Sequence, residues 1–208
     1  MRSLRIDHIV YAVRDLDTAA ALFADEHGLV AVAGGRHPGW GTENRIVALG
    51  GAYLELVQVA DPERASANGF GRAIRRATER GDGLAGWAVA TDELLAVAAR
   101  LGLEVMAGAR TRPDGSVLRW RLAGVEIALQ DGALPFFISW DVPADEHPGA
   151  VGGATAPGRI IAIEIRTGKD RARAWLGDDG GLPLRCVGGP SGLSAVTIST
   201  PGGDVVLR

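Results

Sequence analysis

Residues 36–44 carry the densest group of chemically capable side chains in the sequence. The members that can bind or react are Arg36, His37, Trp40, Thr42 and Asn44. Together they offer a guanidinium for an anion, an imidazole for proton transfer, an aromatic wall and two hydrogen-bonding groups. Glycines and a proline restrict the path of this segment, and ligand sites concentrate on loops held by a rigid scaffold. The segment is therefore a candidate site for a small molecule bearing a carboxylate or another oxyanion. The alternative is a rigid hairpin loop in which Trp40 only covers the core.

The other histidines and the cysteine each allow a functional and a structural interpretation. His147 stands directly before Pro148, as either a pocket residue or a solvent-facing loop histidine. His27 ends a predicted helix, where interaction with the helix dipole favours a structural role. Cys186 lies among strand-forming residues and is the single cysteine. We interpret it as a structural thiol in a reducing compartment.

The composition excludes several classes of protein. The chain has 208 residues, 47% of them hydrophobic and 23% charged, which suits a compact globular protein. The net charge of −3 comes from interspersed charges, so a nucleic-acid partner is not expected. No apolar run approaches the roughly 20 residues of a membrane-spanning helix, so no membrane partner is expected and the protein is expected in the cytoplasm. Neither a Gly-x-Ser-x-Gly elbow nor a Gly-Lys-Ser/Thr phosphate loop occurs, which leaves serine and nucleotide hydrolases without a motif.

Residues 1–62 predict one βαβββ unit. β-branched and aromatic side chains predict a strand over residues 6–13. A helix follows, with Asp15 or Asp17 at its start, apolar residues at i, i+3 and i+4, and Gly28 at its end. Three further strands are predicted over residues 29–33, 44–49 and 52–59, the last two joined by a glycine turn.

The order of elements then begins again in residues 63–148. After a predicted helix at 64–80 with a solvated charged face, residues 87–89 match 11–13, and Gly102 takes the place of Gly28. Residues 107–110 repeat 33–36, which puts Arg110 in the place of Arg36. Strands are predicted at 118–122 and 125–130, with an additional strand at 134–140.

A third, shorter unit is predicted over residues 158–208. Gly, Ala and Pro dominate residues 149–158, which are interpreted as a linker loop. The predicted elements beyond it are strands at 160–167, 184–187, 194–199 and 204–207 and a helix at 170–176.

The three βαβββ copies, the opening residues 6–13 and the segment 35–42 resemble the glyoxalase-like family of the vicinal-oxygen-chelate superfamily. Residues 134–140 and the pair His147-Pro148 are also similar to that family. The resemblance covers nearly the whole chain and implies an α+β fold, in which repeated βαβββ units form cupped half-barrel sheets with helices packed outside. It leaves the chemistry open, because this scaffold hosts lyases, isomerases, oxygenases and metal-free binding proteins.

The resemblance also implies a place for a metal. In the superfamily a divalent metal is held by a His on the first strand and a Glu on the last strand of a unit, and His8 and Glu55 match those places. Alternation along a strand lets both point into the cup. Zn, Fe, Mn or Ni would suit such ligands, with His37 or His147 as the third. The repeat places Leu84 and Ala128 opposite His8 and Glu55, so the second unit lacks ligands.

Two functions follow from this resemblance. The first is a glyoxalase-like small-molecule enzyme with lyase or isomerase chemistry, in which Arg36 anchors an anionic group. Glu55 would be catalytic, with a metal or as a general base, and His37 is the other candidate base. Trp40, Thr42, Asn44 and His147 would help to bind the substrate. The alternative is a non-catalytic small-molecule binding protein, with His8 and Glu55 as a buried pair in a metal-free pocket. A homodimer through strand edges is consistent with either.

Overall fold

The computed structural model describes residues 4–112, 115–150, 158–177 and 181–208 of the chain. Its first unit consists of β1 (Arg5–Ala12), α1 (Leu16–His27), β2 (Val32–His37), β3 (Thr42–Leu49) and β4 (Ala52–Val59). Next come α2 (Pro62–Ser66), α3 (Gly69–Glu79), β5 (Gly83–Ala90), α4 (Leu94–Leu101), β6 (Val105–Thr111), β7 (Val117–Ala123), α5 (Val125–Asp131) and β8 (Phe136–Trp140). Short 3-10 turns at Ala144–Glu146 and Pro148–Ala150 precede β9 (Arg159–Arg166), α6 (Lys169–Leu176), β10 (Leu184–Val187), β11 (Gly192–Thr200) and β12 (Gly203–Leu207).

Strands β1 to β8 form a closed barrel in the order β1-β4-β3-β2-β6-β7-β8-β5. Each half is one repeat unit, and the α+β class with cupped half-barrels is confirmed. The two halves join along two seams of unequal length. Strands β1 and β5 pair antiparallel along most of their length. Between β2 and β6 the paired position is Arg36 with Thr111.

Local signals in the sequence explain α1 and β1. The Asp15 side chain accepts from the backbone N–H of Thr18, and Gly28 ends the helix at φ 66°, so Asp15 rather than Asp17 is the N-cap. Along β1, Ile9 packs into the cluster outside the barrel and Val10 into the cluster inside it. The pairing of β1 with β5 shifts between Ile6 and His8, which marks a β-bulge at that point.

The predicted strand over residues 125–130 is wrong, because this segment is helix α5. Gly124 begins the helix at φ 79°, and Val125, Ala128 and Leu129 are buried with the i, i+3, i+4 spacing of a helix. A short apolar run does not distinguish a strand from a buried helix. The run predicted as an additional strand, β8, is therefore the closing strand of the second half.

This correction moves the repeat register. Val10 pairs with Glu55 in the first half, and Ala88 pairs with Phe136 in the second. If Val10 and Ala88 are equivalent, as the matching strand pairs indicate, Phe136 rather than Ala128 is the counterpart of Glu55. Two residues earlier on each first strand, Gly86 rather than Leu84 is then the counterpart of His8. The prediction that the second half lacks both side chains is unchanged.

The strand predicted over residues 29–33 begins and ends later, as β2. The predicted loop is consequently a hairpin, with Arg36 and His37 on β2 and Thr42 and Asn44 on β3. Backbone N–H groups of Trp40 and Gly41 donate to the His37 carbonyl oxygen, and Gly41 has φ 69°. The turn itself is therefore short.

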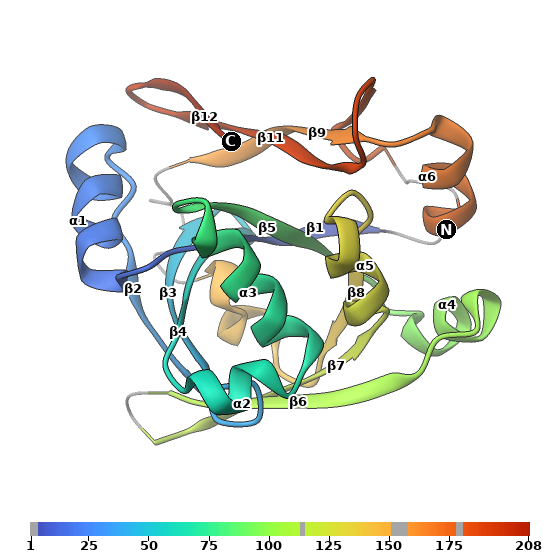
Figure 1. The fold of residues 1–208 in the computed structure, drawn as a ribbon, viewed down its shortest axis with the longest axis horizontal. Helices are drawn as coiled ribbons and strands as arrows, with labels where there is room; N and C mark the ends of the chain where they lie inside the picture. Colours follow the sequence, from blue (N-terminus) through green and yellow to red (C-terminus); the bar gives the residue numbers. More distant parts are fainter. Residues whose placement is uncertain (1–3, 113–114, 151–157, 178–180) are drawn as a thin grey trace.

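Helices α3 and α5 close one end of the barrel, whereas α1 and α4 pack on its outside, as expected (Figure 1). Phe70 and Ile74 of α3 are buried with the inward residues Val10 and Val57 in one cluster. The predicted helix over residues 64–80 is divided into α2 and α3. Its apolar face, which the sequence interpretation did not use, covers the barrel interior.

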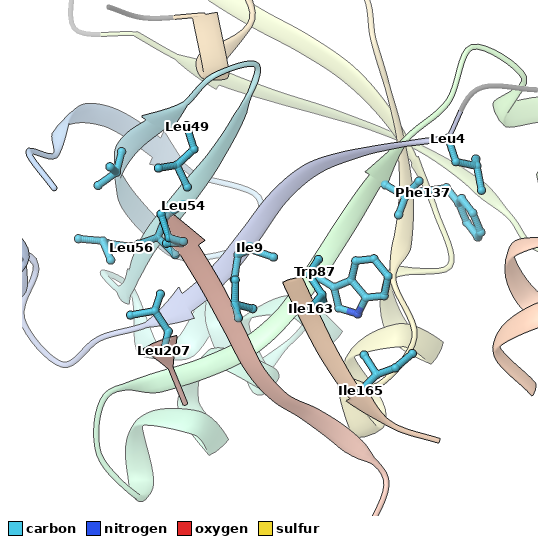
Figure 2. Close-up of a cluster of buried hydrophobic side chains, with 14 of the residues drawn as sticks. Leu4, Ile9, Leu49, Leu54, Leu56, Trp87, Phe137, Ile163, Ile165 and Leu207 are labelled. Atoms are coloured by element: carbon cyan, nitrogen blue, oxygen red, sulfur yellow. The ribbon is translucent and has the colours of Figure 1, made fainter. Parts of the chain in front are cut away.

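The remaining strands form a four-stranded sheet, β10-β9-β11-β12, beside β1 and β5 (Figure 1). Ile163 and Ile165 of this sheet join Ile9 and Trp87 of the barrel in one hydrophobic cluster (Figure 2). The element order matches the predicted third unit, but β9 pairs with β10 in parallel. In the first half, by contrast, the first strand pairs with the last. The unit boundaries at 62–63 and 148–158 remain a proposal, because most of the predicted linker, residues 151–157, lies outside the described ranges.

None of the helices within the described ranges has the length and apolar composition needed to cross a lipid bilayer.

Candidate functional site

A pocket lies inside the barrel, with a polar side and an apolar side. The polar side comes largely from the first half: His8, His37, Asn44, Tyr53 and Glu55, together with Arg110 from β6. The apolar side is formed by Trp40, Phe70, Trp120, Leu122, Val125, Phe136, Ile138 and Trp140. The space between the walls is about 410 Å³, part of it open solvent, and side chains fill most of what lies between them. The pocket is therefore narrow.

Glu55 is the central acid of the pocket and is 5% exposed. Its Oε1 accepts a hydrogen bond from Asn44 Nδ2. Asn44 Oδ1 in turn accepts from Arg110 Nη1 at 3.1 Å. The amide of Asn44 thus stands between the carboxylate and the guanidinium. Glu55 Oε2 lies 3.8 Å from His8 Nε2, so this second oxygen faces an imidazole across the pocket.

Asp7, which was not predicted as a site residue, orients two histidines, although it does not itself line the pocket. It is 1% exposed. His8 Nδ1 lies 2.6 Å from Oδ1, while His147 Nε2 and the Trp140 indole lie 3.0 and 2.8 Å from Oδ2. Burial alone would raise the pKa of Asp7, but the hydrogen bonds from His147 and His8 outweigh it and hold that pKa well below its usual value. As a carboxylate, Asp7 accepts from His8 Nδ1, which holds the ring with Nε2 toward Glu55.

His147 is close to the pocket but does not line it. The backbone N–H of Gly149 donates to His147 Nδ1 at 3.0 Å, so Nε2 carries the proton that is donated to Asp7. The ring also contacts Tyr53 and Trp140 edge-on. We interpret His147 as a positioning residue, which ties the segment after β8 to Asp7.

The hairpin residues divide between two faces. His37, Trp40 and Asn44 line the pocket, and Thr42 supports His37 with its hydroxyl 3.1 Å from Nδ1. Arg36 does not join them. Its side chain is 79% exposed outside the barrel and pairs with Glu43 at 3.2 Å. Strand alternation explains this, because adjacent residues of β2 face opposite sides. The arginine in the pocket is instead Arg110, which the repeat had placed opposite Arg36.

His37 is neutral at neutral pH. Burial is the main reason that its pKa is lowered from 6.5 to about 4; Glu55 opposes the shift, and Arg110 and His8 reinforce it. Its Nε2 lies 3.9 Å from Glu55 Oε1. At neutral pH the ring therefore faces Glu55 without a charge of its own.

The shifted pKa of His37 predicts acid sensitivity. The unfolded chain binds a proton at this ring below pH 6.5, whereas the folded protein stays neutral there down to about pH 4. The unfolded state therefore binds more protons in this window, and lowering the pH favours unfolding by up to about 3 kcal/mol. Chemical denaturation at pH 7 and pH 4.5 should show this loss in the wild type and less of it in His37→Gln. Equal losses in both proteins would contradict the assignment.

The donors in the pocket do not make a metal site in this arrangement. Within the described ranges, no group of three or more His, Cys, Asp or Glu side chains is placed to hold a metal ion. His147, one candidate third ligand, is turned toward Asp7, and Glu55 Oε1 is taken by Asn44. The buried guanidinium of Arg110 also opposes a second positive charge nearby. The residues of this pocket, as they are arranged, thus do not fit a divalent metal ion.

This conclusion can be tested by elemental analysis of protein purified without chelators or metal-affinity steps. We expect substoichiometric Zn, Fe, Mn and Ni, because a stable site takes three or more convergent ligands. His8→Ala should leave the metal content unchanged. Near-stoichiometric metal that disappears in His8→Ala would show that the donors rearrange around an ion.

Comparison with known proteins agrees with this architecture. Residues 6–177 match the family described as Glyoxalase-like domain. A hypothetical protein from Staphylococcus aureus has a similar structure, at 17% identity and a TM-score of 0.67, over 98% of this chain and 84% of that one. A Streptomyces coelicolor methylmalonyl-CoA epimerase variant in complex with 2-nitronate-propionyl-CoA is similar at 20% identity and a TM-score of 0.50, over 67% of this chain and 100% of that one.

No curated protein matches the chain. The structural likenesses, at these identities, concern the fold, whereas the family match covers the whole barrel. The chain belongs to the glyoxalase-like domain family.

Proposed function

We propose that this protein is a metal-independent enzyme that moves a proton on a small, oxygen-bearing, anionic substrate, with isomerase or lyase chemistry. The observation that carries the proposal is the arrangement of Glu55. One carboxylate oxygen is held by Asn44, and the other faces His8 Nε2 inside a pocket that also contains Arg110. A fixed base beside a buried positive charge suits removal of a proton next to a carbonyl group.

The proposed step begins at Glu55 Oε2, which takes a proton from the carbon beside the substrate carbonyl. The electron pair of the broken C–H bond moves onto the carbonyl oxygen and gives an enolate, whose negative charge Arg110 offsets. Delivery of a proton to the opposite face of that carbon completes an isomerisation, with Glu55 releasing the abstracted proton to solvent. In a lyase reaction the enolate electron pair re-forms the carbonyl, a double bond forms to the next carbon, and the leaving group departs from that carbon with the electrons of its bond. His8 Nε2, which faces the same space, is placed to hydrogen-bond a substrate hydroxyl or carbonyl oxygen.

The alternative, a non-catalytic binding protein, draws its support from the apolar side of the pocket. Trp40, Phe70 and Trp120 would hold a ligand without chemistry. It does not explain why a carboxylate is buried with a free oxygen directed at an oriented histidine. Burial of an ionisable group is costly, and such arrangements concentrate at catalytic sites.

The test is deuterium exchange at carbon, followed by NMR in D₂O. The panel contains enolisable 2-oxo acids, aryl-substituted carboxylates and an acyl-CoA thioester, the last because the similar Streptomyces coelicolor structure holds a propionyl-CoA analogue. Exchange that depends on the protein and is lost in Glu55→Gln supports the enzyme. Ligands that bind without exchange of any carbon-bound hydrogen would favour the binding protein.

Cytoplasmic location and a homodimer through strand edges also remain proposals. Size-exclusion chromatography with light scattering would decide the oligomeric state.

A further inference from the structure

We propose that Arg110 is the residue that selects the substrate, and that the pocket takes a small carboxylate with a flat, conjugated or aromatic body. This inference rests on the proposed function for the chemistry that follows binding. It concerns recognition, however, and its test requires no turnover.

The first observation is that Arg110 is buried with unused hydrogen-bonding capacity. The residue is 6% exposed and lines the pocket. One nitrogen, Nη1, donates to Asn44, while Nε has no hydrogen-bond partner among the described residues. A buried donor without a partner costs about 1–3 kcal/mol, and more when it is charged. A ligand oxygen that accepts from Nε would remove this cost.

The second observation is that the backbone of β2 leaves room for this guanidinium. A Cβ atom at Gly34 would lie 2.6 Å from Arg110 Nη1 and 2.0 Å from Asn44 Oδ1. Any other residue at position 34 would displace the two side chains. The glycine therefore permits the link between Arg110 and Asn44, and thereby the position of the guanidinium beside Glu55.

The third observation is the shape of the opposite wall. The rings of Trp40 and Phe70 lie 4.9 Å apart and those of Trp120 and Trp140 lie 5.3 Å apart. Trp40 also meets Trp120 edge-on at 6.1 Å. These rings, in a narrow space, favour a flat body that stacks on aromatic faces.

The charge of the ligand follows from the lining. Arg110 is the one Lys or Arg side chain among the residues that form this pocket in the described structure, which suits a singly charged group more than a phosphate. A planar carboxylate matches the guanidinium geometry and gains a charge-assisted hydrogen bond. A neutral amide of the same shape can accept one hydrogen bond from Arg110, but it brings no negative charge and no second acceptor oxygen.

The experiment compares benzoate with benzamide as probes on ¹⁵N-labelled protein. The chain has five tryptophans. The indole N–H signals of Trp40, Trp120 and Trp140 report on the pocket, whereas Trp87 and Trp175 donate to backbone oxygens of Ala133 and Pro135 outside it. Benzoate should shift the pocket signals and leave the other two in place. We expect benzamide to bind at least about tenfold more weakly, the loss of one charge-assisted hydrogen bond.

Variants locate the effect. Arg110→Gln should weaken benzoate at least about tenfold and leave benzamide within about threefold, while Arg110→Lys should give an intermediate loss, because it keeps the charge without the planar fork. Arg36→Gln is the matched control, an arginine at the equivalent position on the outer face, and should change neither affinity. If Arg110→Gln does not fold, Arg110→Lys and the two-probe comparison in the wild type still test the assignment.

Equal affinity for the two probes, no binding of benzoate, or an equal loss in Arg36→Gln would overturn this proposal. If benzoate binds selectively but no compound of the substrate panel exchanges a carbon-bound hydrogen, the proposed enzyme is rejected and the proposed recognition by Arg110 stands.

Discussion

Replacing Glu55 with glutamine is expected to lower the rate of carbon-bound hydrogen exchange by about 10²–10⁴-fold. The amide keeps the size of the side chain, but its oxygen is not a base that can accept the substrate proton. Asn44 Nδ2 can still donate to the remaining oxygen, so the fold and the pocket should persist. The measurement is the exchange rate by NMR in D₂O, at saturating concentrations of the substrate that the panel identifies.

Glu43→Gln is the matched control for this substitution. Glu43 lies on β3, the antiparallel neighbour of the strand that contains Glu55, but its carboxylate binds Arg36 and Gln58 outside the barrel pocket. Its replacement should leave exchange within about twofold of the wild type. Thermal unfolding of both variants should stay close to that of the wild type, which separates a lost base from a damaged fold. Retained exchange in a folded Glu55→Gln protein would remove Glu55 from the chemistry.

The second large effect is expected on stability. Asp7→Ala should lower the free energy of unfolding by about 3–5 kcal/mol, because the buried His8 and the partly buried Trp140 and His147 all lose their shared acceptor. Asp7→Asn should also destabilise, since its amide nitrogen would face one of these donors. Asp7 itself contributes its stabilisation above its unfolded pKa of 3.8, and the contribution is lost as the pH falls below that value.

Urea denaturation at pH 7 measures this effect, and near-ultraviolet circular dichroism reports on Trp140 at the same time. Asp92→Ala serves as the control, because its side chain is 83% exposed and pairs only loosely with Arg5 at 3.7 Å. Its effect should stay within about 0.5 kcal/mol. A loss below about 1 kcal/mol for Asp7→Ala would show that the three donors find other partners and that Asp7 does not organise the two histidines.

Much of the fold could be predicted because local signals agreed with tertiary structure. The Asp15 cap, the Gly28 stop and the repeated order of elements were sufficient for the first half of the barrel. Predictions failed where local preference was weak. The predicted strand ended before Gly34 and Gly35, because glycine is depleted in strands, whereas β2 continues through both residues. That these glycines make room for neighbouring side chains and backbone was visible only in the folded protein.

The candidate site was predicted in part for similar reasons. His8 and Glu55 face the pocket, as strand alternation predicted, and His37, Trp40 and Asn44 of the predicted loop line it as well. The same alternation would direct Asp7 away from His8, and only the bulge in β1 brings both into the interior. Arg110 was visible as the repeat partner of Arg36. Which of the two faces inward depends on strand register, which composition does not reveal.

The unequal seams of the barrel have a mechanical consequence. The long pairing of β1 with β5 joins the two halves along most of both strands, whereas β2 and β6 are paired at a single position. Separating the halves therefore breaks fewer backbone hydrogen bonds between β2 and β6 than between β1 and β5. Arg36 is the paired residue of β2, and the next residue, His37, lies on the pocket wall. We therefore expect the two halves to part more readily along this seam, beside the pocket wall that contains His37, than between β1 and β5.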